Sequence, residues 1–546
     1  MSGSTMETVT DTPQTRSSSD IRLEARMQAL TRLSEALQSV YQRCPDLPVL
    51  GIRWMHLKHP LHEIQEALLD TDGAFGETGG RLNVPSAVEL VGQLARCVVF
   101  GGYLSVQLIR LRFLVRRQVR VLARQRFEVV ARTCCFESDR PADGSDFYFG
   151  DLQQRLAGRG FRMLLLCGDG TGGKWLRFAK GQAATSGLCR MPELALVHPL
   201  APLRMAGMQL WTSCSLLYRG RELSTPLARR ISRLASRSCL SQETTLNGLM
   251  FWVGSAAARR WQPKAFLTLY EGHAWEACLR LGVKSADGSC RTVGYQHTMV
   301  FRESLALTAS SGGVENRSVP DVVLGLGEAP LELMRAGHAR SRTRMVRFGS
   351  FRYHASGVLR PANPDRRTIL VTPEGIPSEV QILLTFAVAC AKRLPSYTFV
   401  LRCHPQVPIA KALALVPEDL TRQPNVILSE RRSIEEEFAR ASILLYRGSS
   451  SVMYGILHGL LPVYLHHGAS DRDPLYTLQA WRRRCASVDA CVQILREHEQ
   501  ASGEQLAEEW AAAAAYVNDY TGPVTDDHLD AFLDAVGLTH HSPCTA

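Results

Sequence analysis

The sequence lacks any pair of cysteines with metal-binding spacing. Its 15 cysteines are an odd number, and no two of them stand in a CxxC pattern. Zinc ribbons and disulfide frameworks need regular spacing, so both classes are excluded. Reduced, mostly buried thiols in a cytoplasmic protein are the expectation. No Asp-x-Asp motif stands at the end of a predicted strand, so no metal site is predicted.

The chain also lacks the features of a secreted or membrane-spanning protein. Residues 1–20 are rich in Ser and Thr, have no apolar core, and are expected to form a disordered tail. The nearest approach to a spanning segment, residues 98–109, contains Gly101 and Gly102. It falls short of the roughly 18 apolar residues that a spanning helix needs. The sequence therefore predicts no transmembrane helix.

Positive charge is present in excess but is concentrated in one stretch. The 546 residues carry a net charge of +11, with 45% hydrophobic and 21% charged residues, which suits a globular protein of two or three domains. Residues 110–132 alone contain eight arginines and a single acid, Glu128. The excess favours an anionic partner. Because it is local, it argues against a general nucleic-acid-binding surface.

Two blocks of alternating strands and helices follow a helical region. Residues 21–125 are predicted to be a helical accessory region, and residues 501–546 C-terminal helices and a tail. Between them, residues 126–345 and 346–500 each alternate short apolar runs with helical patterns. This alternation is typical of parallel sheets covered on both faces. We therefore predict an α/β fold with two Rossmann-like lobes and a ligand cleft between their strand ends.

Polar residues follow three predicted strands of the second lobe. They are an acid beside a glycine, a histidine before a proline, and a run of serines before a helix. A carboxylate accepts hydrogen bonds from a base or a sugar, and a glycine allows close backbone approach. Hydroxyls and free N–H groups at a helix start can bind an anion. The predicted donor-binding residues are Glu374, Gly375, Arg402, His404, Pro405, Arg447, Ser449, Ser450 and Ser451.

The first lobe supplies candidate catalytic carboxylates. Glu271 follows the apolar run AFLTLY and is the first candidate for a general base, with Asp169 the second. Glu276 and His297 are predicted to contact an acceptor substrate or to serve as accessory residues of the site, and His297 could also contact a diphosphate. The alternatives are a surface carboxylate for Glu276 and a hydrogen-bonded strand-end histidine for His297.

The order acidic-Gly, His-Pro, Ser-Ser resembles bacterial sialyltransferases, polysialyltransferases and related Kdo-transferring capsule enzymes. That resemblance implies a GT-B fold and a CMP-linked sugar donor. It also implies phosphate contacts for His404, Ser449 and Ser450, and nucleoside contacts for Glu374 and Gly375.

A second resemblance covers roughly residues 130–480. The segments at residues 147–152, 270–276, 294–297 and 348–350 look like a group of bacterial surface-carbohydrate-biosynthesis proteins. This resemblance implies a part in capsule or O-antigen assembly, without a defined reaction.

These patterns together predict a glycosyltransferase without a cofactor. It would move a sugar from a nucleotide donor to a surface polysaccharide or a lipid-linked glycan. A CDP-glycerol-type polyol-phosphate transferase and a catalytically inactive GT-B module remain alternatives. Residues 98–132 run from apolar to arginine-rich, which favours peripheral contact with an anionic membrane at its cytoplasmic face. The alternative is a core helix followed by a solvated basic helix on the first lobe.

Overall fold

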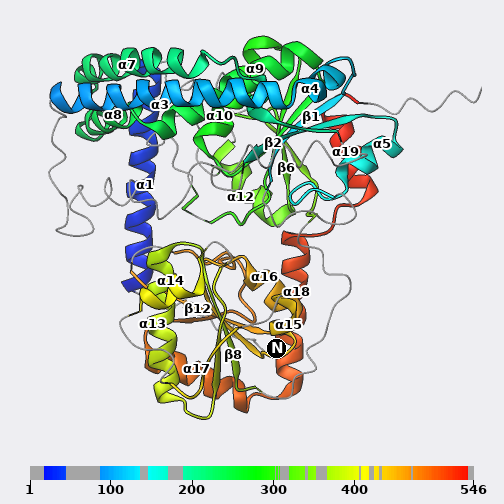
Figure 1. The fold of residues 1–546 in the computed structure, drawn as a ribbon. Coiled ribbons are helices and arrows are strands. Elements are labelled where there is room, and N and C mark those ends of the chain that lie inside the picture. Colours follow the sequence, from blue (N-terminus) through cyan, green and yellow to red (C-terminus); the bar gives the residue numbers. More distant parts are fainter. Residues whose placement is uncertain are drawn as a thin grey trace, which may run out of the picture.

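The computed structural model describes residues 18–44, 87–135, 145–169, 189–301, 303–304, 307, 319–338, 342–351, 366–404, 407–416, 423–429, 433–468 and 471–538. Two lobes, one above the other in Figure 1, account for most of these residues.

The first lobe contains a seven-stranded parallel sheet. Its spatial order is β3-β2-β1-β4-β5-β6-β7, so the progression of the chain reverses between β1 and β4. This is the strand order of a Rossmann sheet with one further strand. The strands are β1 (Val129–Cys135), β2 (Met163–Asp169), β3 (Arg190–Pro192), β4 (Ala265–Leu269), β5 (Arg291–Tyr295), β6 (Val322–Gly325) and β7 (Arg344–Arg347).

The second lobe repeats this topology with six parallel strands. Its order is β10-β9-β8-β11-β12-β13, and the reversal falls between β8 and β11. The strands are β8 (Thr368–Pro373), β9 (Thr398–Leu401), β10 (Val426–Leu428), β11 (Ile443–Arg447), β12 (Leu461–Leu465) and β13 (Arg483–Cys485). The predicted α/β fold with two Rossmann-like lobes is confirmed.

Helices cover both sheets. In the first lobe these are α5 (Leu152–Gly158), α10 (Ala274–Ala286) and α12 (Glu328–His338). In the second lobe they are α13 (Pro377–Arg393), α14 (Ile409–Ala414), α15 (Glu435–Phe438), α16 (Ser451–Leu457) and α17 (Val488–Gln500). The chain then continues through α18 (Gly503–Tyr520) to α19 (Asp526–Ala535), which packs on β7 of the first lobe.

Alternation along the strands explains why both faces are covered. In β2, Leu164 and Leu166 belong to the apolar cluster under the N-terminal helices, whereas Met163 and Leu165 belong to the cluster on the opposite face. Successive side chains of a strand point to opposite faces, so a continuous apolar run requires protein on both sides.

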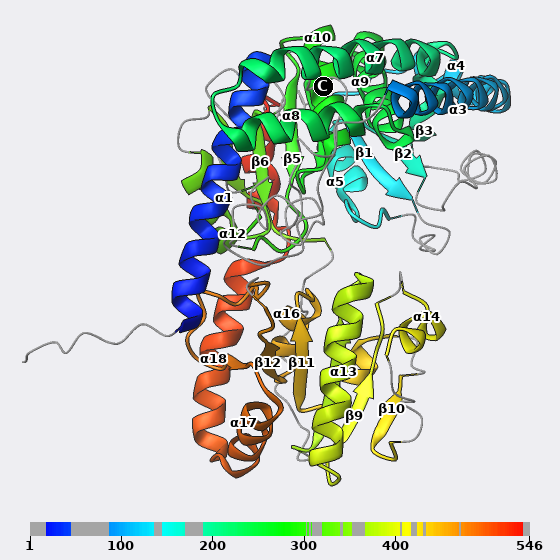
Figure 2. The same cartoon turned by 90° about the vertical axis from the view of Figure 1, so that its left-hand side faces the viewer.

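A layer of helices extends one side of the first lobe (Figures 1 and 2). It combines the N-terminal region with residues 201–261, an insertion between β3 and β4 that the sequence analysis did not separate from the first lobe. Its helices are α1 (Ser18–Arg43), α3 (Ala87–Leu114), α4 (Arg116–Ala123), α7 (Ala201–Arg219), α8 (Pro226–Cys239) and α9 (Gln242–Trp261). A side chain at Gly254 would overlap the carbonyl oxygen of Leu279, so α9 and α10 meet backbone to backbone.

Helix α3 corrects the expectation that no segment could span a membrane. By length and composition alone, Val88–Leu114 is long and apolar enough to cross a membrane, with a mean hydropathy of 1.4 in its most apolar window. The run at residues 98–109 is only part of this helix, which continues through Gly101 and Gly102. At Gly101 the helix packs closely on α7, where an added Cβ would lie 3.1 Å from the carbonyl oxygen of Pro202. Only 33% of the most apolar window is buried.

A buried ion pair connects the two lobes. Arg26 of α1 donates from Nε to Glu303 Oε2 at 2.9 Å, and the backbone N–H of Asp471 in the second lobe donates to Glu303 Oε1 at 2.8 Å. Arg26 and Glu303 are 1% and 0% exposed. At the other side, the backbone N–H of Val300 donates to the hydroxyl of Tyr520 at the end of α18, 2.9 Å away. Both contacts bring the loop after β5 against the second lobe.

Replacing Glu303 by Ala should destabilise the protein strongly. The substitution removes the carboxylate from a buried guanidinium and from a backbone N–H, which typically costs about 3–5 kcal/mol in the free energy of unfolding. Urea denaturation followed by tryptophan fluorescence measures the loss. Glu328→Ala is the matched control, because the Glu328–Arg335 pair is exposed. Its loss should lower the free energy of unfolding by less than about 1 kcal/mol. Equal losses in the two variants would contradict a structural role for Glu303.

Candidate functional site

The carboxyl ends of three strands of the second lobe meet at one edge of the sheet. Glu374 directly follows β8, residues 448–450 directly follow β11, and His404 stands just beyond the end of β9. The strand order reverses between β8 and β11. Ligands of open parallel sheets bind outside such a reversal, which makes this edge the candidate site.

A pocket of about 210 Å³ opens between the lobes at this edge. The first lobe contributes Glu271 from the end of β4 and part of the loop after β5. The lining residues are Glu271, Thr298, Met299, Phe301, Ser304, Leu307, Glu374, His404, Gly448, Ser449 and Ser450. Five of the residues predicted from the sequence therefore come together in one place: Glu271, Glu374, His404, Ser449 and Ser450.

Two histidines hold the carboxylate of Glu271. Nε2 of His297 lies 2.7 Å from Oε1, and Nε2 of His273 lies 3.5 Å from Oε2. His297 is buried, and its ring packs edge-on against Tyr148 at a centroid distance of 4.7 Å. A carboxylate accepts hydrogen bonds, so an N–H at either Nε2 can orient the side chain of Glu271. His297 does not line the pocket. Its contact fits the orientation of Glu271 better than the predicted contact with an acceptor.

Glu276 stabilises the turn that carries Glu271. Its carboxylate accepts from the backbone N–H of Glu271 at 3.1 Å and from that of Gly272 at 3.1 Å. The side chain is 0% exposed, and Arg280 lies 3.8 Å away. Both predicted readings of Glu276, an acceptor contact and a surface carboxylate, are therefore wrong. The residue is in the first turn of α10 and points back to the free N–H groups before the helix.

Arg472 fixes the carboxylate of Glu374 and was missed in the sequence. Its Nη1 lies 2.5 Å from Oε2, and its Nη2 donates to Oε1 at 3.0 Å. Arg472 is fully buried, and its Nη1 is also 3.6 Å from Glu379. The only sequence signal is the charged run at residues 471–473 directly before Pro474. Paired in this way, Glu374 lines the pocket with its carboxylate held in place.

Glycines allow the two loops of the second lobe to approach each other. Gly448 has φ of +72°, and a side chain there would overlap Oε2 of Glu374. A Cβ at Gly375 would lie 2.9 Å from Nδ1 of His404. Positive φ and close approach are both properties that favour glycine. The predicted contact of Gly375 with a nucleoside stays a prediction.

The serines divide into two groups. Ser449 and Ser450 line the pocket, whereas the hydroxyl of Ser451 donates to Thr372 at 3.0 Å and lies 2.7 Å from that of Ser449. Ser451 therefore stabilises the loop after β11 through its contacts with Thr372 and Ser449. Helix α16 begins at Ser451 and has only 7 residues, so the hydroxyls of Ser449 and Ser450 matter more here than a helix dipole.

The two predicted arginines do not reach the pocket. Arg447 is buried, and its Nε donates to Glu379 at 2.5 Å while its Nη1 donates to the carbonyl of Leu465 at 3.1 Å. Arg402 donates to the hydroxyl of Ser429 at 3.1 Å, on the side of β10. Arg447 is the last residue of its strand and faces α13, where it forms a buried ion pair with Glu379. Neither arginine lines the pocket, so the geometry gives no support to the predicted donor contacts.

The remaining predicted residues are not tested by this geometry. Asp169 is the last residue of β2, and only its backbone belongs to the described part of the structure. Pro405 lies outside the described residues. Within the described part of the chain, no group of three or more His, Cys, Asp or Glu side chains is placed to hold a metal ion.

The topology of the two sheets and the pocket between them define a GT-B-type fold. No protein-family model matches the chain, and no curated protein matches it in sequence. Similar solved structures include the glycotransferase of kitacinnamycin, with 13% identity over 76% of this chain and 99% of that chain and a TM-score of 0.42. They also include S. aureus MnaA with UDP, with 9% identity over 76% of this chain and 99% of that chain and a TM-score of 0.42. A third is MurG of Acinetobacter baumannii, with 11% identity over 75% of this chain and 99% of that chain and a TM-score of 0.37.

Replacing Gly448 by Ala should displace Glu374 and destabilise the second lobe. The new Cβ would enter space occupied by the carboxylate and would strain the backbone, at a cost of about 1–3 kcal/mol. Gly207→Ala is the control, because Gly207 is in the exposed face of α7 and no atom lies within 4 Å of its added Cβ. The free energy of unfolding of that variant should rise by about 0.5–1 kcal/mol, because Ala is more stable than Gly within a helix. Urea midpoints compare the two, and an unchanged midpoint for Gly448→Ala would show that the loop relaxes freely.

Proposed function

We propose that the protein transfers a glycosyl group from a nucleotide-linked sugar to an acceptor hydroxyl. The observation that carries the proposal is the pocket between the lobes. It combines an oriented carboxylate from the first lobe with a histidine, two serines and a second carboxylate from the second lobe. A carboxylate that can take a proton and donors that can hold a phosphate are the groups such a transfer needs.

The second lobe would hold the donor. His404 and the hydroxyls of Ser449 and Ser450 can donate hydrogen bonds to phosphate oxygens. The carboxylate of Glu374 is paired with Arg472 and would accept hydrogen bonds from ribose hydroxyls or a base amine. With this division, the nucleoside would lie towards β8 and the phosphate towards β9 and the loop after β11.

Glu271 would act as the general base. The acceptor oxygen attacks the anomeric carbon, the bond from that carbon to the phosphate oxygen breaks, and the acceptor proton passes to Glu271. His297 would keep the carboxylate oriented. His404, when protonated, would stabilise the charge that develops on the departing phosphate.

A CMP-linked sugar is the first donor to test, and a surface polysaccharide or lipid-linked glycan is the proposed acceptor. The order of Glu374-Gly375, His404-Pro405 and Ser449-Ser450 supports this choice through its resemblance to sialyl- and Kdo-transferring enzymes. CDP tests the alternative polyol-phosphate transfer.

A matching nucleotide should raise the melting temperature of the protein, and His404→Ala should abolish that rise. At 100 times its Kd a ligand stabilises the folded state by about 2.7 kcal/mol. Thermal denaturation with CMP, CDP, UDP and GDP measures the effect. His467→Ala, which removes an exposed histidine of the same lobe that does not line the pocket, should keep the full rise. A His404→Ala protein that still responds would assign the nucleotide to another site.

Glu271→Gln should retain nucleotide binding but lose turnover. Loss of a general base slows a reaction by about 100- to 10,000-fold. Release of nucleotide from the sugar donor identified above, with water as the acceptor, gives the rate. Glu332→Gln, an exposed carboxylate on α12 of the same lobe, is the control and should react at the normal rate. Normal turnover in Glu271→Gln would remove Glu271 from the mechanism.

A further inference from the structure

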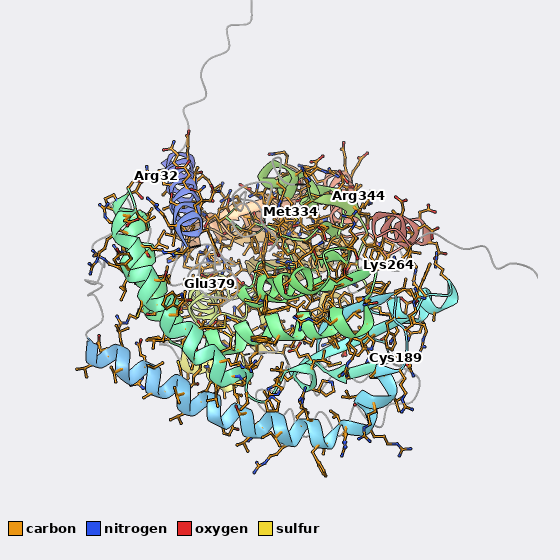
Figure 3. All side chains as sticks on the ribbon, turned by 90° about the horizontal axis from the view of Figure 1, so that it is seen from above. Arg32, Cys189, Lys264, Met334, Arg344 and Glu379 are labelled. Atoms are coloured by element: carbon orange, nitrogen blue, oxygen red, sulfur yellow. The ribbon has the colours of Figure 1, made fainter. Side chains whose placement is uncertain are left out.

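The outer face of α3 is apolar although it is exposed. Its inner face packs on the first lobe through buried leucines, among them Leu104, Leu108 and Leu111. The opposite face exposes large apolar side chains along its whole length, with Val99 at 73% and Phe113 at 81%. These side chains are Val88, Val91, Val98, Val99, Tyr103, Val106, Ile109 and Phe113. Figure 3 shows α3 along the outer edge of the molecule. A contiguous exposed apolar stripe of this kind marks an interaction surface.

The same helical layer carries the positive charge of the chain. Residues 87–123 and 201–261 contain fifteen arginines and three glutamates, with no lysine or aspartate. Their excess of positive charge exceeds the net +11 of the whole protein, so the remaining residues are close to neutral. The layer is therefore both apolar and cationic, which is the composition of a surface that binds anionic membranes.

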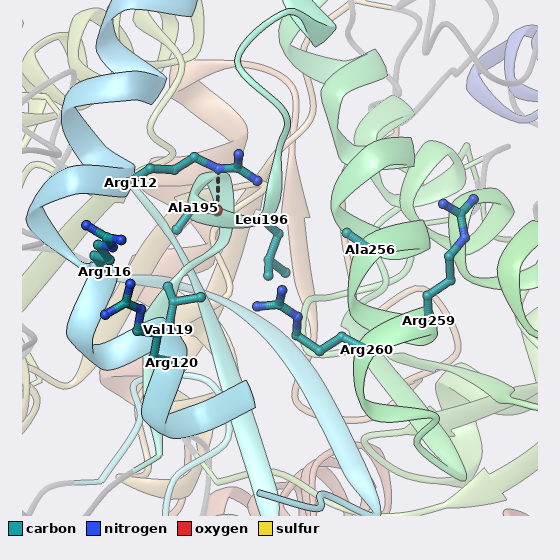
Figure 4. A pocket seen from close by; sticks show the side chains of 9 residues that line it. All are labelled: Arg112, Arg116, Val119, Arg120, Ala195, Leu196, Ala256, Arg259 and Arg260. Atoms are coloured by element: carbon teal, nitrogen blue, oxygen red, sulfur yellow. Dashed lines mark hydrogen bonds between the residues drawn. The ribbon is translucent and has the colours of Figure 1, made fainter. Parts of the chain in front are cut away.

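Arginines gather around a second pocket where α3 passes into α4. This pocket has a volume of about 460 Å³ and is lined by Arg112, Arg116, Arg120, Arg259 and Arg260. In Figure 4, Arg112 and Arg260 point into the space between α3 and α9, and Arg116 and Arg120 extend from α4 at the edge of that space. We call these four residues the arginine pocket.

The arginine pocket holds no counter-charge of its own. Among the described residues, no carboxylate lies within 4.0 Å of any of the four guanidinium groups. The one hydrogen bond of the set runs from Arg112 Nε to the carbonyl oxygen of Ala195, at 3.2 Å. Burial and the neighbouring charge of Arg260 lower the pKa of Arg112. Four like charges around one cavity are stabilised by an anion.

We propose that the arginine pocket binds the phosphate headgroup of an anionic membrane lipid while the outer face of α3 lies in the acyl boundary. Ile109 and Phe113 stand one turn before Arg112 and Arg116, so the apolar stripe leads directly to the pocket. The helix lies along the surface, because its inner face is occupied by protein. The second lobe lies on the opposite side of the first lobe from α3 and α4 (Figure 1). The lipid site is therefore separate from the pocket between the lobes and does not depend on the proposed reaction.

Co-sedimentation with vesicles tests the headgroup site. The protein should bind phosphatidylcholine vesicles that contain phosphatidylglycerol, in roughly 0.1 M salt, and bind pure phosphatidylcholine weakly. The variant Arg116→Gln/Arg120→Gln/Arg260→Gln should bind about 100-fold more weakly, since each arginine near an anionic surface contributes roughly fivefold. An unchanged melting temperature shows that the variant is folded.

A charge-matched control separates a site from diffuse attraction. Lys392→Gln/Arg393→Gln/Arg496→Gln removes three exposed charges from the second lobe and should bind vesicles like the original protein. Equal weakening in both triple variants would overturn the proposal. The proposal would also be overturned if the protein did not bind anionic vesicles but had a higher melting temperature with inorganic phosphate. The pocket would then bind a soluble anion.

A second set of variants tests the helix. Val99→Ser/Val106→Ser/Phe113→Ser keeps every charge and removes exposed apolar area, so it should weaken vesicle binding by about tenfold or more. Binding as tight as that of the original protein would show that α3 does not enter the acyl boundary and would overturn that part of the proposal.

Discussion

The two lobes and the pocket between them depend on one short buried segment, residues 471–473. The backbone N–H of Asp471 binds Glu303 of the first lobe, and the next side chain, Arg472, holds Glu374 at the edge of the pocket. Asp473 is bound in turn by a tyrosine and an arginine of the second lobe. All three side chains are almost inaccessible. Buried charges are stable only when they are paired, so the contact between the lobes and the position of Glu374 are set by the same few bonds.

The fold could be predicted because its strands repeat a simple pattern. Short apolar runs such as those of β4 and β11 are buried at every position, and that pattern implies helices on both faces of a parallel sheet. The insertion at residues 201–261 was not separated from the first lobe, because helical patterns between two predicted strands are also what ordinary covering helices give. In the structure, α7 and α8 pack mainly on α1, α3 and α9. Their association with α3 depends on tertiary contacts such as that between α3 and Pro202, which no local pattern contains.

The candidate site could be predicted only where position along a strand decides it. Glu271 and Glu374 follow the ends of parallel strands, and such ends meet at one edge of the sheet. Arg447 stands within the strand itself, so alternation turns its side chain towards Glu379 and away from the pocket. Arg472 comes from a loop beyond β12 and reaches Glu374 across almost a hundred residues. Nothing near either residue in the sequence indicates that pair.

Arginine residues show most clearly what the sequence leaves open. Arg447 and Arg472 lie behind the candidate site, where Glu374 and Glu379 pair with them, and this makes them structural. The arginine pocket lies far from that site, and none of its four members has a carboxylate partner among the described residues. Counting charges cannot separate these cases, because both are arginines in apolar surroundings. What separates them is the distance to the nearest carboxylate. A guanidinium that the fold has already paired stabilises the protein, whereas an unpaired cluster beside an exposed apolar helix is available to an anion from outside.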